Sequence, residues 1–190
     1  MTLASDPHAN PHALSQAAPA VSPSAALDLM ARHTPAPRRL VGSFVFHAPI
    51  EIVFDRMTDP NQIAGWMGMI TGGALDHSAS ETPGEWGKGS KRLCHTDSMG
   101  VLDETIAEYR APHFIVYKIR NDKMPIKDHA AYMRLVSAGP NRTEVEWAQY
   151  YNPNGVMGLI FPMVMKGKMT QGMAALRKEI GGEKGRMVAI

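Results

Sequence analysis

The sequence has few residues that could cross-link the fold covalently or bind a metal ion. Its 190 residues include one cysteine, Cys94, and a single cysteine cannot form a disulfide bond within the chain. Chains without disulfides are typical of reducing compartments, so we expect a cytoplasmic protein. The eight histidines are scattered and lack the short spacings of a metal site. We therefore expect no metal and no cofactor.

An excess of charge of one sign is also absent, as are long apolar runs. The 20 basic and 18 acidic residues give a net charge of +2, which does not favour a nucleic-acid partner. No segment approaches the roughly 18 apolar residues that cross a membrane. The nucleophile elbow, the Walker loop and the His-Glu-x-x-His zinc motif are missing too. We expect a soluble domain with a small-molecule partner, no nucleic acid and no membrane span, and its oligomeric state stays open.

The two ends of the chain differ in composition from its middle. Residues 1–38 are rich in Ala, Pro and Ser and poor in aromatic and β-branched residues. Such a segment buries too little apolar surface to offset its ordering entropy. We expect a mostly disordered tail over residues 1–38, although a short helix over 24–32 is an alternative, and we expect its deletion to leave the melting temperature nearly unchanged. The folded domain is expected over residues 39–182, followed by a C-terminal tail over 183–190.

The folded part begins with one strand and two short helices. Leu40–His47 has the composition of a strand. Pro49 then suits the start of a helix, whose apolar residues recur at helical spacing: Ile50, Val53, Phe54 and Met57. Asp59 and Pro60 are typical of a second helix start, as cap and first residue, and this helix is expected to reach Trp66.

Strand-like segments follow at regular intervals, and the chain then becomes helical. After an irregular strand within residues 68–89, turn signals separate the segments 88–97, 100–109, 113–120, 127–136 and 142–151. Short connections make neighbouring strands antiparallel. The final stripe repeats every three or four residues and contains Met165, Met169, Met173, Leu176 and Ile180. This pattern predicts an α+β domain, with an antiparallel meander followed by a C-terminal helix over residues 163–180 that is long enough to lie across the sheet.

Several short motifs occur in an order that is fairly specific as a set. They are Phe46-His47-Ala48-Pro49-Ile50-Glu51-Ile52-Val53-Phe54, Thr58-Asp59-Pro60, Glu104-Thr105-Ile106-Ala107-Glu108-Tyr109 and Arg142-Thr143-Glu144-Val145-Glu146-Trp147. Over about Leu40 to Gly181, the chain resembles the SRPBCC superfamily (START-like, or birch-pollen-allergen-like), in particular the polyketide cyclase/dehydrase and lipid transport family. The resemblance implies a helix-grip fold: a seven-stranded curved antiparallel sheet around a long C-terminal helix, with two short helices after the first strand. It implies a hydrophobic ligand between sheet and helix, and no single reaction.

Alternation along the strands predicts which side chains face this cavity. The expected lining is Trp66, Glu104, Ile106, Tyr117, His129, Met133, Trp147, Gln149, Tyr151, Met165, Met169 and Met173. Turn positions place Glu104 opposite Ile119 and Ile106 opposite Tyr117. They also place His129 near Tyr117 and opposite Gln149 or Tyr151. We therefore expect a polar row of Glu104, Tyr117, His129 and Gln149 or Tyr151 inside an apolar cavity.

This row is compatible with two main functions. The first is binding or transfer of a hydrophobic small molecule, such as a lipid, a polyketide or a quinone-like compound, because such sites are apolar with a few polar anchors. The second is a polyketide cyclase/dehydrase-type enzyme, with His129 or Glu104 as base and Tyr117 or Tyr151 as donor. A protein-interaction module of the same fold is a weaker third option. The structural alternatives are that Glu104 only pairs with Arg92 and that His129 is a hydrogen-bonded core residue.

Overall fold

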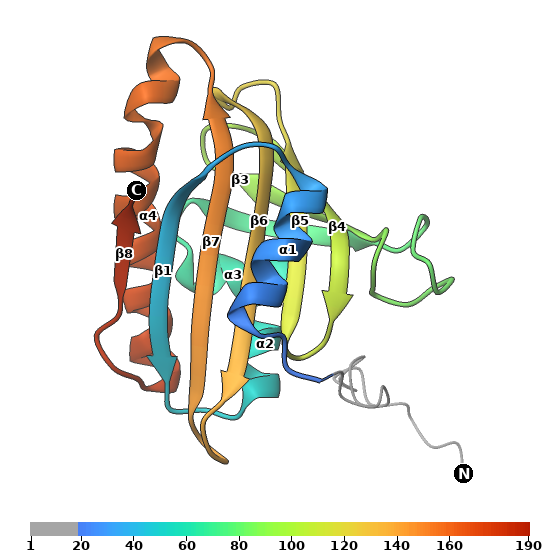
Figure 1. The fold of residues 1–190 in the computed structure, drawn as a ribbon, viewed down its shortest axis with the longest axis vertical. Helices are drawn as coiled ribbons and strands as arrows, with labels where there is room; N and C mark the ends of the chain where they lie inside the picture. The colour runs from blue at the N-terminus through green and yellow to red at the C-terminus, as the bar shows by residue number, and fades with distance from the viewer. Residues whose placement is uncertain (1–18) are drawn as a thin grey trace.

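A computed structural model describes residues 19–190 of the chain, and these residues form one antiparallel sheet with helices on both of its faces (Figure 1). The strands are β1 (Arg38–Phe46), β2 (Ile70–Asp76), β3 (Lys91–Thr96), β4 (Val101–Arg110), β5 (Phe114–Arg120), β6 (Ile126–Ser137), β7 (Thr143–Pro153) and β8 (Arg186–Ala189). The helices are α1 (Pro23–His33), α2 (Ile50–Thr58), α3 (Pro60–Trp66) and α4 (Gly155–Ile180). In space the strands follow the order β2-β3-β4-β5-β6-β7-β1-β8.

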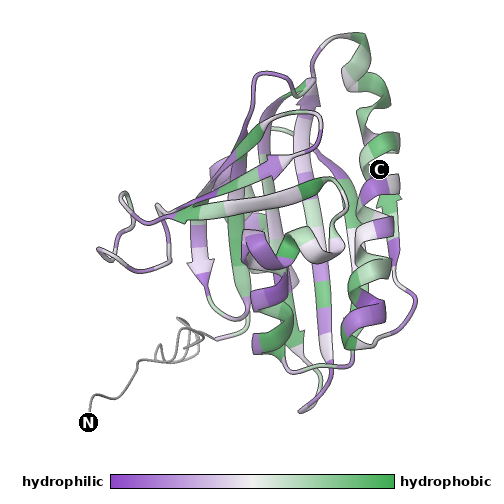
Figure 2. Cartoon of the chain, turned by 180° about the vertical axis from the view of Figure 1, so that it is seen from behind, coloured by the Kyte–Doolittle hydropathy of each residue, from purple (hydrophilic) through white to green (hydrophobic). Residues whose placement is uncertain are grey.

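The predicted architecture is confirmed: an antiparallel meander with two short helices after the first strand and a long helix near the end. Asp59 begins α3 as expected, because its carboxylate accepts a hydrogen bond from the backbone N–H of Asn61 at 2.8 Å. Gly181, with a φ of 77°, ends α4. Figure 2 shows α2, α3 and α4 together on the face of the sheet opposite α1.

Helix α4 is longer than its methionine stripe predicts. It begins at Gly155, eight residues before the expected start, and carries Pro162 inside it. Its second half buries Met169, Met173 and Leu176 against the sheet. Its first half exposes apolar side chains, namely Val156, Met157, Leu159, Ile160, Met163 and Val164, and appears green at the end of α4 in Figure 2. In the described part of the chain, no helix combines the length and hydropathy needed to cross a membrane.

The predicted C-terminal tail is wrong for residues 186–189, which form β8. This strand pairs with β1, with Met187 opposite Gly42, and it raises the number of strands from the expected seven to eight. The physical reason lies at Gly42, where a Cβ atom would come within 2.7 Å of the Met187 Cε atom. Because Gly42 has no side chain, β1 leaves room for Met187, which is buried.

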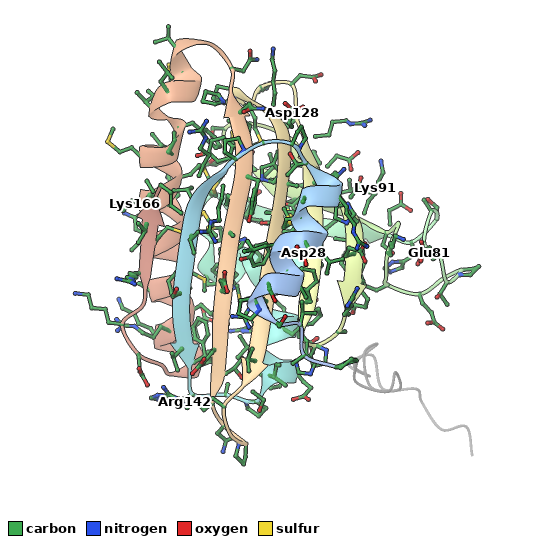
Figure 3. All side chains as sticks on the ribbon, viewed as in Figure 1. Asp28, Glu81, Lys91, Asp128, Arg142 and Lys166 are labelled. Atoms are coloured by element: carbon green, nitrogen blue, oxygen red, sulfur yellow. The ribbon has the colours of Figure 1, made fainter. Side chains whose placement is uncertain are left out.

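The predicted N-terminal tail is wrong from α1 onward, while residues 1–18 of that tail lie outside the described residues. Helix α1 is capped by Ser22, whose Oγ accepts from the Ala25 backbone N–H at 3.2 Å. The helix packs on the outer face of the sheet and buries Ala26, Leu29 and Met30 against Phe114, Val116, Ala130, Tyr132, Ala148 and Tyr150. Asp28 lies on the exposed side of the same helix (Figure 3). Strands that are apolar on both faces need such a covering helix. The average composition of residues 1–38 does not reveal this helix, because only the spacing of its apolar residues does.

Candidate ligand-binding cavity

A cavity lies between the sheet, α3 and α4, on the face away from α1. The space not filled by atoms in and around this cavity is about 710 Å³, which includes open solvent at its mouth. Ten of the residues expected from the sequence line it: Trp66, Glu104, Tyr117, His129, Met133, Trp147, Gln149, Tyr151, Met165 and Met169. The other two, Ile106 and Met173, are buried in the adjoining core and do not line the cavity. Strand alternation identifies a face, but it does not say how far along that face the cavity extends.

Methionine is the commonest residue of the lining. Eight of the fourteen methionines are there: Met57, Met67, Met69, Met99, Met124, Met133, Met165 and Met169. Only the last three were expected in the lining. Met57 was expected in the apolar stripe of α2 but not in the cavity, and the other four lie outside helices and strands, where side chains have no fixed period. Unbranched, polarisable thioethers adapt to irregular apolar shapes, so this wall can fit a ligand whose outline is not matched in advance.

The predicted register is found between β4 and β5, whereas His129 lies within a register shift between Lys127 and Ala130 and is not paired with Gln149 as expected. Glu104 lies opposite Ile119, Ile106 lies opposite Tyr117, and Ala131 lies opposite both Tyr117 and Gln149 on its two neighbouring strands. Short turns fix which residues pair, and pairing fixes the face that each side chain occupies. The expected row of Glu104, Tyr117, His129 and Gln149 is therefore assembled by β4, β5, β6 and β7.

Hydrogen bonds connect three of these side chains in one direction. The Ile119 backbone N–H donates to His129 Nδ1 at 3.1 Å, and His129 Nε2 lies 2.7 Å from Gln149 Oε1. The Gln149 amide then donates to the Tyr117 hydroxyl at 3.1 Å. Because a backbone N–H can only donate, Nδ1 of His129 must accept, and its proton sits on Nε2. We call this arrangement, from the Ile119 N–H to Tyr117, the hydrogen-bonded chain.

His129 is neutral in this arrangement. Burial lowers the pKa of His129 to about 4, although its hydrogen bond to Gln149 opposes that shift. Its two ring nitrogens are both engaged, one by the Ile119 backbone and one by Gln149. The structural reading of His129 as a hydrogen-bonded core residue is thus supported by its contacts.

The buried neutral imidazole predicts a loss of stability in acid. The unfolded chain binds a proton at His129 near pH 6.5, whereas the folded chain does so only near pH 4. Stability from this group is complete above pH 6.5 and falls as the pH drops toward 4, by about 3 kcal/mol in total. We expect the free energy of unfolding, measured with denaturant, to fall less between pH 7 and pH 4 in His129→Gln than in the wild type. Equal losses in the two proteins would contradict this assignment.

A buried ion pair lies beside the hydrogen-bonded chain. The Arg92 Nε donates to Glu104 Oε2, and the two side chains are only 2% and 7% exposed. Arg92 Nη1 also donates to the carbonyls of Met57 and Thr58, at 3.1 and 3.0 Å. The guanidinium lies 5.1 Å from the centre of the Tyr117 ring. Arg92 therefore connects the end of α2 to β3 and β4. Its ion pair with Glu104 is the structural alternative that the sequence analysis gives for Glu104.

The remaining reactive groups of the cavity stay protonated. Burial, reinforced by the nearby Glu104 carboxylate, raises the pKa of the Cys94 thiol to about 12. The same two causes, in the same order, raise the pKa of Tyr117. Burial also raises the pKa of Tyr151 to about 12. Cys94 is thus not a nucleophile of the thiolate kind, and both tyrosines present neutral hydroxyls.

Comparisons with known proteins identify the family of the chain. Residues 37–181 match the family model described as polyketide cyclase/dehydrase and lipid transport. A sequence comparison with curated proteins gives no match.

Solved structures with the same fold include three from different organisms. XoxI from Bacillus cereus is 17% identical, with a TM-score of 0.59 over 74% of this chain and 93% of that one. A START superfamily protein from Mycobacterium smegmatis is 15% identical, with a TM-score of 0.59 over 75% and 97%. An HSP90 activator from Plasmodium falciparum is 15% identical, with a TM-score of 0.57 over 76% and 98%. At these identities the likeness shows the fold alone. The match over residues 37–181 shows that the chain belongs to the polyketide cyclase/dehydrase and lipid transport family.

Proposed function

We propose that this protein binds or transfers a hydrophobic small molecule, of the lipid, polyketide or quinone-like kind, in the cavity between the sheet and α4. The observation that carries the proposal is a mostly apolar, methionine-rich lining that contains one ordered polar row. Small-molecule sites are typically concave and apolar, with a few polar groups that orient the ligand. The family to which the chain belongs includes lipid transport in its description.

The alternative of a cyclase/dehydrase-type enzyme has less support from the contacts. A general base needs a free lone pair within reach of the proton that it removes. His129 uses its only lone-pair nitrogen to accept from the Ile119 backbone, and Glu104 is paired with Arg92. Tyr117 and Tyr151 keep the hydroxyls that either function would use. Ligand binding without chemistry is therefore the function that we favour.

A matched pair of substitutions on α4 tests the proposal. Met165 lines the cavity and is half-buried, whereas Met163, on the same helix, is 70% exposed and lies outside the lining. Met165→Glu places a carboxylate in an apolar wall, so we expect it to weaken binding of the apolar dye Nile red at least about tenfold. Met163→Glu should leave the affinity unchanged. Fluorescence titration measures both.

Two results would contradict the proposed function. One is that the wild-type protein does not bind Nile red. The other is that the two glutamate variants weaken binding equally, since the dye would then occupy the exposed apolar surface of α4 instead of the cavity.

A further inference from the structure

The hydroxyl of Tyr117 has one hydrogen-bonding capacity left over. A phenol hydroxyl can accept two hydrogen bonds and donate one. Both acceptor positions are filled, because Trp147 Nε1 donates to it at 2.9 Å and Gln149 Nε2 donates to it at 3.1 Å. No described residue accepts the proton of Tyr117, although the side chain is only 2% exposed. Buried donors are rarely left unpaired in folded proteins, so the Tyr117 proton can be shared with an acceptor from outside the chain.

The hydrogen-bonded chain strengthens this donor and fixes its role. Each group donates toward Tyr117: the Ile119 N–H to His129, His129 to Gln149, and Gln149 to the tyrosine oxygen. Hydrogen bonds aligned in this way polarise one another in a low-dielectric interior. Because both lone pairs of the hydroxyl are occupied, Tyr117 cannot accept a bond from a ligand. It can only donate, so the ligand atom next to it must be an acceptor.

The charges around the cavity limit what kind of acceptor fits. Glu104 lines the cavity and is ion-paired with Arg92, and no lysine or arginine occurs among the described lining residues. Lys166, on α4, lies on the outside of the molecule (Figure 3). A ligand carboxylate would therefore be buried near Glu104 without a cation of its own, which is costly. A neutral acceptor avoids this cost.

A second unpaired polar atom supports a polar ligand group in the cavity. The Tyr151 Oη is buried and has no hydrogen-bond partner among the described residues. Its side chain also lines the cavity, with the ring edge-on to Phe161 at 5.4 Å between centroids. The cavity thus holds two phenol hydroxyls with hydrogen-bonding capacity to spare: that of Tyr117 on β5, whose proton has no acceptor among the described residues, and that of Tyr151 on β7, which has no partner there.

We infer that the ligand is a neutral carbonyl compound, such as a ketone, quinone or ester, whose carbonyl oxygen accepts the hydrogen bond of the Tyr117 hydroxyl. This inference rests on the proposed function, since it describes the ligand of the same cavity. The apolar body of the ligand packs against the methionine wall. Tyr117 and the groups that donate to it recognise the single polar atom.

Three probes of similar shape test the inference on the full-length protein. Benzophenone carries the carbonyl, diphenylmethane replaces it by a methylene group, and diphenylacetate carries a carboxylate. We expect Tyr117→Phe to weaken benzophenone binding roughly five- to 150-fold, because the ligand oxygen would then be buried without a donor. The affinity for diphenylmethane should change less than about twofold. Diphenylacetate should bind the wild type at least about tenfold more weakly than benzophenone.

A control variant and a spectroscopic measurement separate the outcomes. Tyr132→Phe removes a buried tyrosine hydroxyl that bonds Glu146 on the outer face of the sheet, and it should leave benzophenone binding unchanged. In the wild type, the infrared carbonyl stretch of bound ¹³C-benzophenone should lie at lower frequency than that of benzophenone without a hydrogen bond. This measurement tests the inference even if Tyr117→Phe does not fold. An unshifted stretch would overturn the inference, as would equal losses for benzophenone and diphenylmethane in Tyr117→Phe. If no probe binds the wild type but Nile red does, only the inference fails; if Nile red fails as well, the proposed function fails.

Discussion

Replacing Arg92 with methionine is expected to lower the free energy of unfolding by about 3–5 kcal/mol, the largest effect that we predict for a single substitution. The guanidinium is the ion-pair partner of Glu104, and both side chains are buried. Removing it leaves the Glu104 carboxylate buried without a cation. It also leaves the carbonyls of Met57 and Thr58 without this donor. Urea unfolding followed by circular dichroism measures the loss.

The neighbouring ion pair provides a matched control. Lys91 and Asp103 lie on the same two strands, at 2.8 Å, but their side chains are 38% and 31% exposed. Lys91→Met should therefore cost only about 0–1 kcal/mol, because solvent screens an exposed pair. The double variant Arg92→Met/Glu104→Leu should regain much of the stability that Arg92→Met loses, since it removes the stranded charge. Equal losses of stability in Arg92→Met and Lys91→Met would show that the loss does not depend on burial of the Arg92–Glu104 pair.

Truncating Met30 should be nearly as damaging, although this residue lies in a segment whose composition predicts disorder. Met30 is 1% exposed, and it packs in the cluster between α1 and the outer face of the sheet. We expect Met30→Ala to lower the free energy of unfolding by about 2–5 kcal/mol, because the truncation leaves a cavity under the helix. Thermal and urea unfolding should both report the loss.

Leu27 is the control for this prediction, because it lies on the same helix and is 45% exposed. Leu27→Ala should change the stability by no more than about 0.5 kcal/mol. Deletion of residues 1–37 should lower the melting temperature strongly, in contrast to the expectation from composition, since it uncovers the apolar outer faces of β5, β6 and β7. An unchanged melting temperature after that deletion would mean that α1 does not stabilise the sheet.

The centre of the sheet was predictable from the sequence because its connections are short. A turn centred near Ala111-Pro112 predicts the pairing of Glu104 with Ile119 and of Ile106 with Tyr117, which the structure has, although it reaches this register through a shift between Ile106 and Glu108. Helix α1 and strand β8 were not predictable in this way, since each depends on a distant surface that it covers or extends. The same limit applies to Met57, Met67 and Met124, which reach the cavity from helix ends and loops.

The spare donor of the Tyr117 hydroxyl could not be predicted from the sequence for a different reason. Alternation predicts that Tyr117 faces inward, but it does not count the hydrogen bonds that its oxygen receives. That count depends on the exact placement of Trp147 and Gln149 on the next strand but one. The donor left over on Tyr117, which defines the ligand chemistry, appears only when all partners are placed.

The strand order also determines how early during synthesis each part of the sheet can form. Strands β2 to β7 are consecutive neighbours, but β1 lies between β7 and β8, so that Phe46 pairs with Thr143 and Leu40 pairs with Ala189. During synthesis, β1 has no partner on either edge until β7 and then β8 have been made. Contacts so distant in sequence slow folding, because a long loop must close before they form. The meander from β2 to β7 can assemble early, and β1 joins the sheet late, by pairing along one edge with β7 and along the other with β8.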